Sequence, residues 1–161
     1  MENIENILLE GLKSKPDFSI SFTQKVETIK NKLEVKLNAY NLIRHDVDMN
    51  YSSSQCLEIY TDRNINLVKQ IDAVFLLKVF VSSRCPLYSY MFYRKENHNI
   101  WKFAQNLNGF EELLTKINIF MEKHNFTLFP YKYKSVVVNG FKTELDNRPA
   151  TYFEILFSEI V

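Results

Sequence analysis

Glycine and cysteine are scarce in this chain, and their scarcity excludes several kinds of site. Only 3 glycines occur among the 161 residues. They are too few and too scattered for the glycine-rich phosphate loops of P-loop or Rossmann proteins. The 2 cysteines, Cys56 and Cys85, are too far apart for a Cys-x-x-Cys motif and too few for a disulfide framework. We expect two reduced, half-buried thiols; a single bridge or one reactive thiol are the alternatives.

Neither sign of charge is in excess, and long apolar runs are missing. The chain has 20 Lys and Arg against 19 Asp and Glu, for a net charge of +1. This balance gives no electrostatic reason to expect nucleic acid or an anionic membrane as a partner. No stretch approaches the roughly 18 apolar residues of a membrane span, and the first residues do not resemble a secretory signal. The sequence therefore predicts a soluble, cytoplasmic protein.

Apolar and aromatic side chains are abundant. Hydrophobic residues make up 46% of the chain, with 13 Phe and 9 Tyr, which is enough for a well-packed core at this length. The stretch 73–95 (AVFLLKVFVSSRCPLYSYMFYRK) predicts two long strands around a tight connection at 82–86. In the second strand, Tyr88 and Tyr90 share one face and Met91 lies on the other. Both faces carry apolar bulk, so we expect each to be at least partly covered.

The remaining pattern alternates helices and strands. Apolar residues recur every three or four positions in four segments, which predicts helices: from Ile4 to a break at 14–17, over 21–43, over 109–124, and a short one over 151–161. We expect a polar loop at 44–55, a strand at 56–60, and a hairpin over 126–145 that turns at Asn139-Gly140. This order predicts one α+β domain over residues 1–161, an antiparallel sheet with a central hairpin packed by two or three long helices.

His45, Asp46 and Asp48 form the most suggestive polar cluster. A histidine and two carboxylates in a loop suit a divalent cation or a general base. A small-ligand-binding protein or hydrolase-type enzyme with a pocket near these residues is therefore one hypothesis. The glycine and other ligands of a calcium loop are missing, and the serine run 52–54 lacks a nucleophile elbow. We accordingly assign no catalytic residue, no metal ligand and no cofactor.

A series of aromatic residues has three interpretations. Its members are Tyr88, Tyr90, Phe92, Tyr93, Trp101, Phe103, Tyr131 and Tyr133. They fit a sheet-to-helix core with hydroxyls at its edge, a protein interface rich in tyrosine, or a surface that stacks nucleic-acid bases. The last would need surrounding positive charge that this neutral chain lacks. For a protein interface, we select residues of the 44–55 loop and of the hairpin: Asp46, Asp48, Tyr51, Tyr88 and Tyr90.

The C-terminal third carries a resemblance to a known class of proteins. It has a hairpin-like segment through Asn139-Gly140, then Lys142-Thr143-Glu144, then the ending Ala150–Ser158 (ATYFEILFS), in which Thr151 and Glu154 have capping-box spacing. This ending resembles the tails of small bacterial immunity proteins that accompany polymorphic or contact-dependent toxins. The resemblance implies a cytoplasmic, non-catalytic inhibitor that occludes its cognate toxin. A protein is thus the expected partner, with a homodimer of this chain as the alternative.

Overall fold

The computed structural model describes residues 3–37, 42–47, 52–61, 74–96, 100–103 and 110–158. Within these ranges, one sheet has six strands: β1 (Leu42–Asp46), β2 (Ser54–Thr61), β3 (Phe75–Ser82), β4 (Leu87–Glu96), β5 (Ile100–Phe103) and β6 (Thr127–Leu128). Strands β1 to β5 lie in chain order, each antiparallel to the next. Strand β6 pairs parallel with the start of β4, so the sheet is mixed. The predicted α+β class is confirmed.

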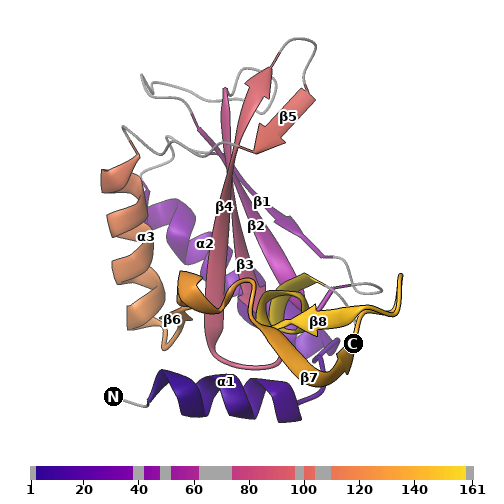
Figure 1. The fold of residues 1–161 in the computed structure, drawn as a ribbon. Helices are drawn as coiled ribbons and strands as arrows, with labels where there is room; N and C mark the ends of the chain where they lie inside the picture. Colours follow the sequence, from indigo (N-terminus) through magenta and orange to yellow (C-terminus); the bar gives the residue numbers. More distant parts are fainter. Residues whose placement is uncertain are drawn as a thin grey trace.

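In the described part of the chain, three α-helices accompany the sheet (Figure 1): α1 (Ile4–Lys13), α2 (Ile20–Lys36) and α3 (Glu111–Lys123). As predicted, α1 ends before Ser14. The Ser19 hydroxyl accepts a 3.1 Å hydrogen bond from the Phe22 N–H and so caps α2. No helix of the described segments is long and apolar enough to cross a membrane.

Two predicted boundaries near residue 40 are wrong. Helix α2 ends at Lys36 instead of continuing to Ile43, and Leu42–Asp46 form β1. The predicted polar loop 44–55 therefore contains part of β1 and the start of β2. Ile43 fitted the helical spacing of the preceding residues, but its side chain is buried in the core from β1. The five residues of β1 have mostly polar side chains, and their backbone N–H and C=O groups form hydrogen bonds by pairing with β2.

The two faces of the sheet pack against different parts of the chain. On one face, alternate residues of β2, β3 and β4 share a core with α2 and α3, which includes Leu57, Leu77, Val79, Phe92, Val26, Ile29, Ile117 and Met121. On the other face, a second core joins α1 to the C-terminal segment, which includes Leu8, Leu87, Phe129, Phe153, Leu156 and Phe157. Both faces of the β3–β4 hairpin are thus covered, which agrees with the apolar bulk on each side of β4.

The last 30 described residues differ from the predicted hairpin. They form a 3₁₀ turn η2 (Tyr131–Tyr133), a two-stranded sheet of β7 (Val137–Lys142) and β8 (Pro149–Thr151), and a π-helical turn η3 (Glu154–Ser158). Asn139-Gly140 does not make the turn; both residues lie inside β7, where Gly140 has φ +88°. The chain reverses between Lys142 and Pro149, with Asn147 at φ 55°. Asparagine tolerates this left-handed conformation, so it serves at the reversal.

Candidate functional site

A groove of about 630 Å³ opens beside the outer edge of β4, and we call it the β4 groove. Its lining consists of Ser89–Phe92 of β4, the segment Leu128–Tyr131, and the side chains of Phe103 and Lys134. In Figure 1, β4 runs between β5 at one end and β6 at the other. The groove therefore lies along β4, between the end that pairs with β5 and the end that pairs with β6.

The groove lies between the two short strands β5 and β6, which pair with opposite ends of β4. Strand β5 pairs with Tyr93–Glu96, and β6 pairs with Leu87 and Tyr88. No described strand pairs with the outer side of Ser89–Phe92. Pro130 follows β6 closely; it has no N–H to continue the ladder, and η2 then turns the chain away.

One residue of β4, Tyr90, directs its backbone groups toward the groove. The Phe129 N–H donates to the Tyr88 C=O (2.8 Å) from the outer side. The Lys95 N–H donates to the Val74 C=O (2.8 Å) on the β3 side. Backbone groups of successive residues in an antiparallel strand point to alternate sides. Even-numbered residues thus face outward, and the N–H and C=O groups of Tyr90 point toward the groove, whereas Phe92 is only 2% exposed.

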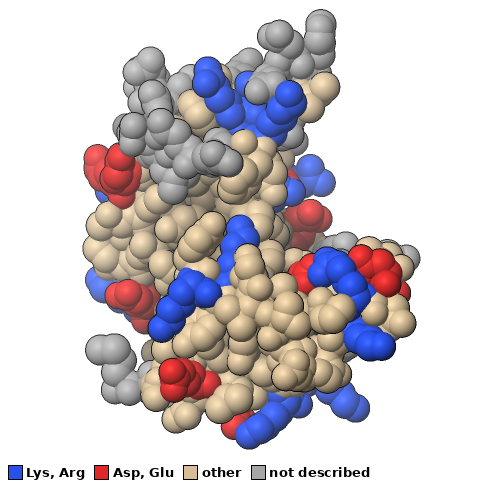
Figure 2. Space-filling model, viewed as in Figure 1, with Lys and Arg blue, Asp and Glu red and all other residues tan. Residues whose placement is uncertain are grey.

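Exposed aromatic rings and one cation form the rim of the groove. Tyr131 is 83% exposed and Phe103 is 55% exposed. The Lys134 Nζ lies 5.8 Å from the Phe103 ring centroid and 5.7 Å from that of Tyr131, within cation–π range. Among the described residues, Lys134 is the only charged side chain in the lining, and no carboxylate pairs with it. In Figure 2, basic side chains lie among uncharged residues in the middle of the view, and most acidic side chains lie toward its margins.

His45, the first residue of the predicted polar cluster, is held inside the fold. Its Nδ1 lies 2.6 Å from Glu27 Oε2, and its Nε2 lies 2.8 Å from Gln55 Oε1. The Gln55 amide nitrogen in turn donates to Thr23 Oγ1 (2.9 Å). The hydrogen bond from His45 lowers the pKa of Glu27. The His45 side chain is only 6% exposed, so this network joins α2 to β1 and β2 and does not face a substrate.

The structure does not bring the other members of that cluster to His45. Asp46 follows His45 in β1 and therefore lies on the opposite face of the strand, where it is exposed. Asp48 and Tyr51 lie outside the described residues. Within the described ranges, no group of three or more His, Cys, Asp or Glu side chains is placed to hold a metal ion. Asp46, Asp48 and Tyr51 stay predictions as partner contacts.

The two hairpin tyrosines have different positions. Tyr88 is fully buried, and its hydroxyl donates to Asn118 Oδ1 of α3 (2.7 Å). Its burial raises the pKa of the phenol. The expectation that Tyr88 is an exposed contact residue is therefore wrong, because the face of β4 that carries it is covered by helices. Tyr90 is half-buried and lines the β4 groove, so its role as a partner contact stays a prediction.

The serines and cysteines have structural surroundings. The hydroxyls of Ser52 and Ser54 donate to the Phe157 C=O, and the Ser82 hydroxyl donates to the Leu156 C=O. These three serines therefore help to hold the π-helical turn η3. Cys56 and Cys85 are free thiols. Burial raises the pKa of Cys56 to about 12 and that of Cys85 to about 11. Neither is therefore an activated nucleophile at neutral pH.

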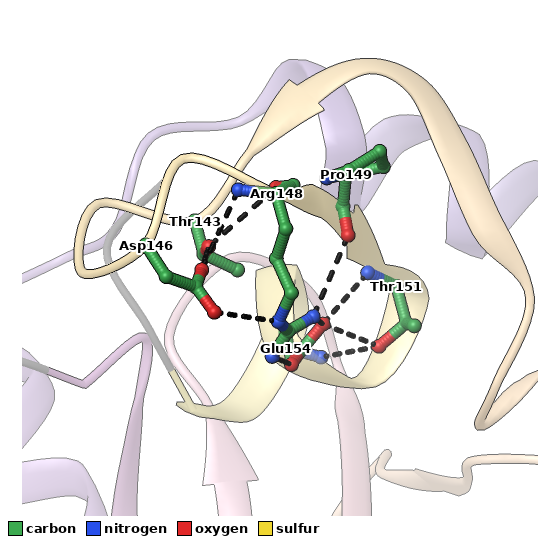
Figure 3. Close-up of polar contacts among 6 residues, drawn as sticks. All are labelled: Thr143, Asp146, Arg148, Pro149, Thr151 and Glu154. Carbon is green, nitrogen blue, oxygen red and sulfur yellow. Dashed lines mark hydrogen bonds and ion pairs between the residues drawn. The ribbon is translucent and has the colours of Figure 1, made fainter.

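The C-terminal segment that resembles immunity proteins is fastened by a polar cluster (Figure 3). The predicted capping box is confirmed: the Thr151 N–H donates to Glu154 Oε2 (2.9 Å), and the Glu154 N–H donates to Thr151 Oγ1 (3.3 Å). Arg148 forms ion pairs with both Asp146 and Glu154. Asp146 also accepts a hydrogen bond from Thr143. These contacts join the β7–β8 reversal to η3.

Comparison with known proteins leaves the resemblance as a prediction. No protein-family model matches the chain, and no curated protein or solved structure matches it. Sequence reasoning placed Phe103 and Tyr131 in the aromatic series but did not select them as contacts, and it missed Lys134. Pro130, inside an aromatic stretch, was the available signal that the chain leaves the sheet there.

Proposed function

We propose that this protein is a non-catalytic protein-binding module that holds a segment of its partner in the β4 groove. The observation that carries the proposal is the pair of exposed rings, Phe103 and Tyr131, on either side of Lys134. Aromatic side chains dominate the binding energy of many interfaces because they give large contact area with few rotatable bonds. Among the described residues, the lining includes no carboxylate, imidazole or thiol, and these groups are common general bases and nucleophiles in enzymes.

In its specific form, the proposal is a toxin-neutralising immunity protein that acts in the cytoplasm. The support for this form is the resemblance of the ending Ala150–Ser158. The β3–β4 hairpin, with α2 and α3 over one face, is the frame that holds the groove in place. A specific complex typically buries about 1,200–2,000 Å² in total. The groove is then the anchor of a larger interface whose remaining contacts include Asp46 and Asp48.

The test is affinity capture with variants matched for exposure. The tagged protein is incubated with a lysate of its source cells that includes the products of neighbouring genes, and captured proteins are quantified by mass spectrometry. Tyr131→Ala removes a ring that is 83% exposed, and Leu145→Ala removes a side chain that is 85% exposed in the β7–β8 reversal. Neither change alters the core.

We expect one stoichiometric partner with the wild type and with Leu145→Ala, and a reduction of about tenfold or more with Tyr131→Ala, as for a hot-spot residue. The absence of any stoichiometric partner would contradict the proposal. A partner captured equally by all three proteins would also contradict it, because binding would then lie elsewhere.

A further inference from the structure

We propose that the partner segment in the β4 groove presents an apolar side chain next to a carboxylate, and that Lys134 binds the carboxylate. This inference rests on the proposed function and names the chemistry of the segment. It follows from the way in which Lys134 is held, from the single charge of the groove and from the apolar side chains around it.

Three aromatic rings hold the ammonium group of Lys134. Its Nζ lies 5.3 Å from the ring centroid of Phe153, 5.7 Å from that of Tyr131 and 5.8 Å from that of Phe103. Each distance is within cation–π range. Phe153 belongs to the buried core that joins α1 to the C-terminal segment. The lysine is therefore positioned before a partner arrives, which lowers the entropic cost of binding.

The ring contacts do not neutralise the charge of Lys134. In the described part of the chain, Lys30, Lys78 and Lys116 each pair with a glutamate, at 3.3, 3.3 and 2.8 Å. Among the same described residues, no carboxylate forms an ion pair with Lys134. An aromatic ring attracts a cation through its quadrupole and has no net charge. An anion from the partner would complete the site.

A carboxylate fits this charge better than a phosphoryl group does. Lys134 is the only charged side chain of the described lining residues, so the groove offers one positive charge. A carboxylate balances it with one negative charge. A phosphoryl group has about 1.5–2 negative charges at pH 7, and burial of the excess among apolar side chains is unfavourable. The anion is therefore an Asp or Glu side chain of the partner, or its terminal carboxylate.

The rest of the lining favours an apolar neighbour for that carboxylate. Met91, Leu128, Phe129 and Pro130 line the same groove. Its volume of about 630 Å³ lies within the range of about 300–1,000 Å³ for sites that hold drug-sized ligands. The groove thus has room for an apolar side chain as well as the acidic group. Burial of the apolar side chain stabilises the complex, and the ion pair fixes its orientation.

The test uses phenylacetate as the probe and phenylacetamide as its neutral control. The two molecules have nearly the same shape, and only the first is charged. Binding to the intact protein is followed by NMR titration, through the methyl resonance of Met91. We expect phenylacetate to bind with a dissociation constant of about 1 mM, as is usual for so small a ligand. It should bind about fivefold more tightly than the amide, and about 0.5 M NaCl should reduce this preference.

Variants at two nearby lysines assign the preference to one side chain. The Lys132 Nζ lies 4.9 Å from the Tyr133 ring centroid, and Lys132 is not part of the groove lining. Lys132→Gln is therefore the matched control, because it removes the same charge two residues away. We expect Lys134→Gln to bind phenylacetate and phenylacetamide equally. Lys132→Gln and Lys134→Arg should both keep the preference for the acid, since each retains a cation at the groove.

Several outcomes would overturn the inference without touching the proposed function. These are no saturable shift of Met91 up to about 20 mM phenylacetate, equal affinity of the wild type for acid and amide, and a preference for the acid that survives in Lys134→Gln. If Tyr131→Ala still lowered capture of the natural partner, the groove would remain the binding site. Acid binding through Lys134 with capture unaffected by Tyr131→Ala would instead show that the groove holds a free carboxylic acid, which would contradict both proposals.

Discussion

Gly11 of α1 is expected to be a site where substitution by alanine destabilises the fold through overpacking. A Cβ atom added at Gly11 would lie 2.8 Å from the Cys85 Sγ and 2.8 Å from the Leu156 Cδ2. Carbon atoms in contact normally stand about 3.5–4.0 Å apart. Leu156 is fully buried, so relief requires movement of the core between α1, the β3–β4 connection and η3.

The magnitude follows from two opposing effects. Replacing glycine by alanine in a helix stabilises it by about 1 kcal/mol. Overpacking a well-filled core costs about 1–3 kcal/mol, occasionally more. Two contacts below 3 Å at one atom place Gly11→Ala at the upper end of that range. We therefore expect its free energy of unfolding to fall by about 1–2 kcal/mol net.

Urea unfolding measures this change, with Asn6→Ala as the control. Asn6 is an exposed residue of the same helix, so alanine there should leave stability unchanged or raise it slightly. The double variant Gly11→Ala/Cys85→Ala should show a favourable coupling energy, because removal of the Sγ relieves one of the close contacts. A Gly11→Ala protein as stable as the wild type would refute the close packing of α1 against the hairpin connection.

Three further predictions concern the side chains around the core. Because its pKa is lowered in the folded state, ionised Glu27 stabilises the fold above pH 4.5, and this stabilisation is lost as the pH falls through the folded pKa. The free energy of unfolding should therefore fall less steeply with decreasing pH in Glu27→Gln than in the wild type. The same slope in both proteins would argue against the His45 contact. With the pKa of Cys85 at about 11, its labelling by a disulfide reagent at pH 8 should be at least about 100-fold slower in the folded protein than in urea; equal rates would contradict its burial. Tyr88→Phe leaves Asn118 without its donor and should cost about 1–2 kcal/mol in urea unfolding, with unchanged partner capture; lost capture at full stability would show that Tyr88 contacts the partner.

Local sequence patterns predicted the elements whose signals act over short distances. The spacing of Ile4, Ile7 and Leu8 gave α1, and the apolar alternation on both sides of residues 82–86 gave the β3–β4 hairpin. Thr151 and Glu154 gave the capping box. Each depends on contacts within a few residues, so periodicity and capping rules are sufficient.

The elements that depend on distant partners were not predictable in this way. Strand β1 has mostly polar side chains and is specified by its pairing with β2. The β4 groove lies between β5 and β6, which are far apart in sequence and pair with opposite ends of β4. Tyr88 and Tyr90 are two residues apart and lie on the same face of β4, so the sequence pattern does not distinguish them. Tyr88 is buried because α3 packs against it.

The most direct test of the central claim is the affinity of the purified partner for three forms of the protein, measured by isothermal titration calorimetry. The account predicts that Tyr131→Ala weakens binding by about tenfold or more, while Leu145→Ala binds as tightly as the wild type. All three should unfold at the same urea concentration. Equal affinities for the three proteins would contradict the claim that the β4 groove is the site of partner binding.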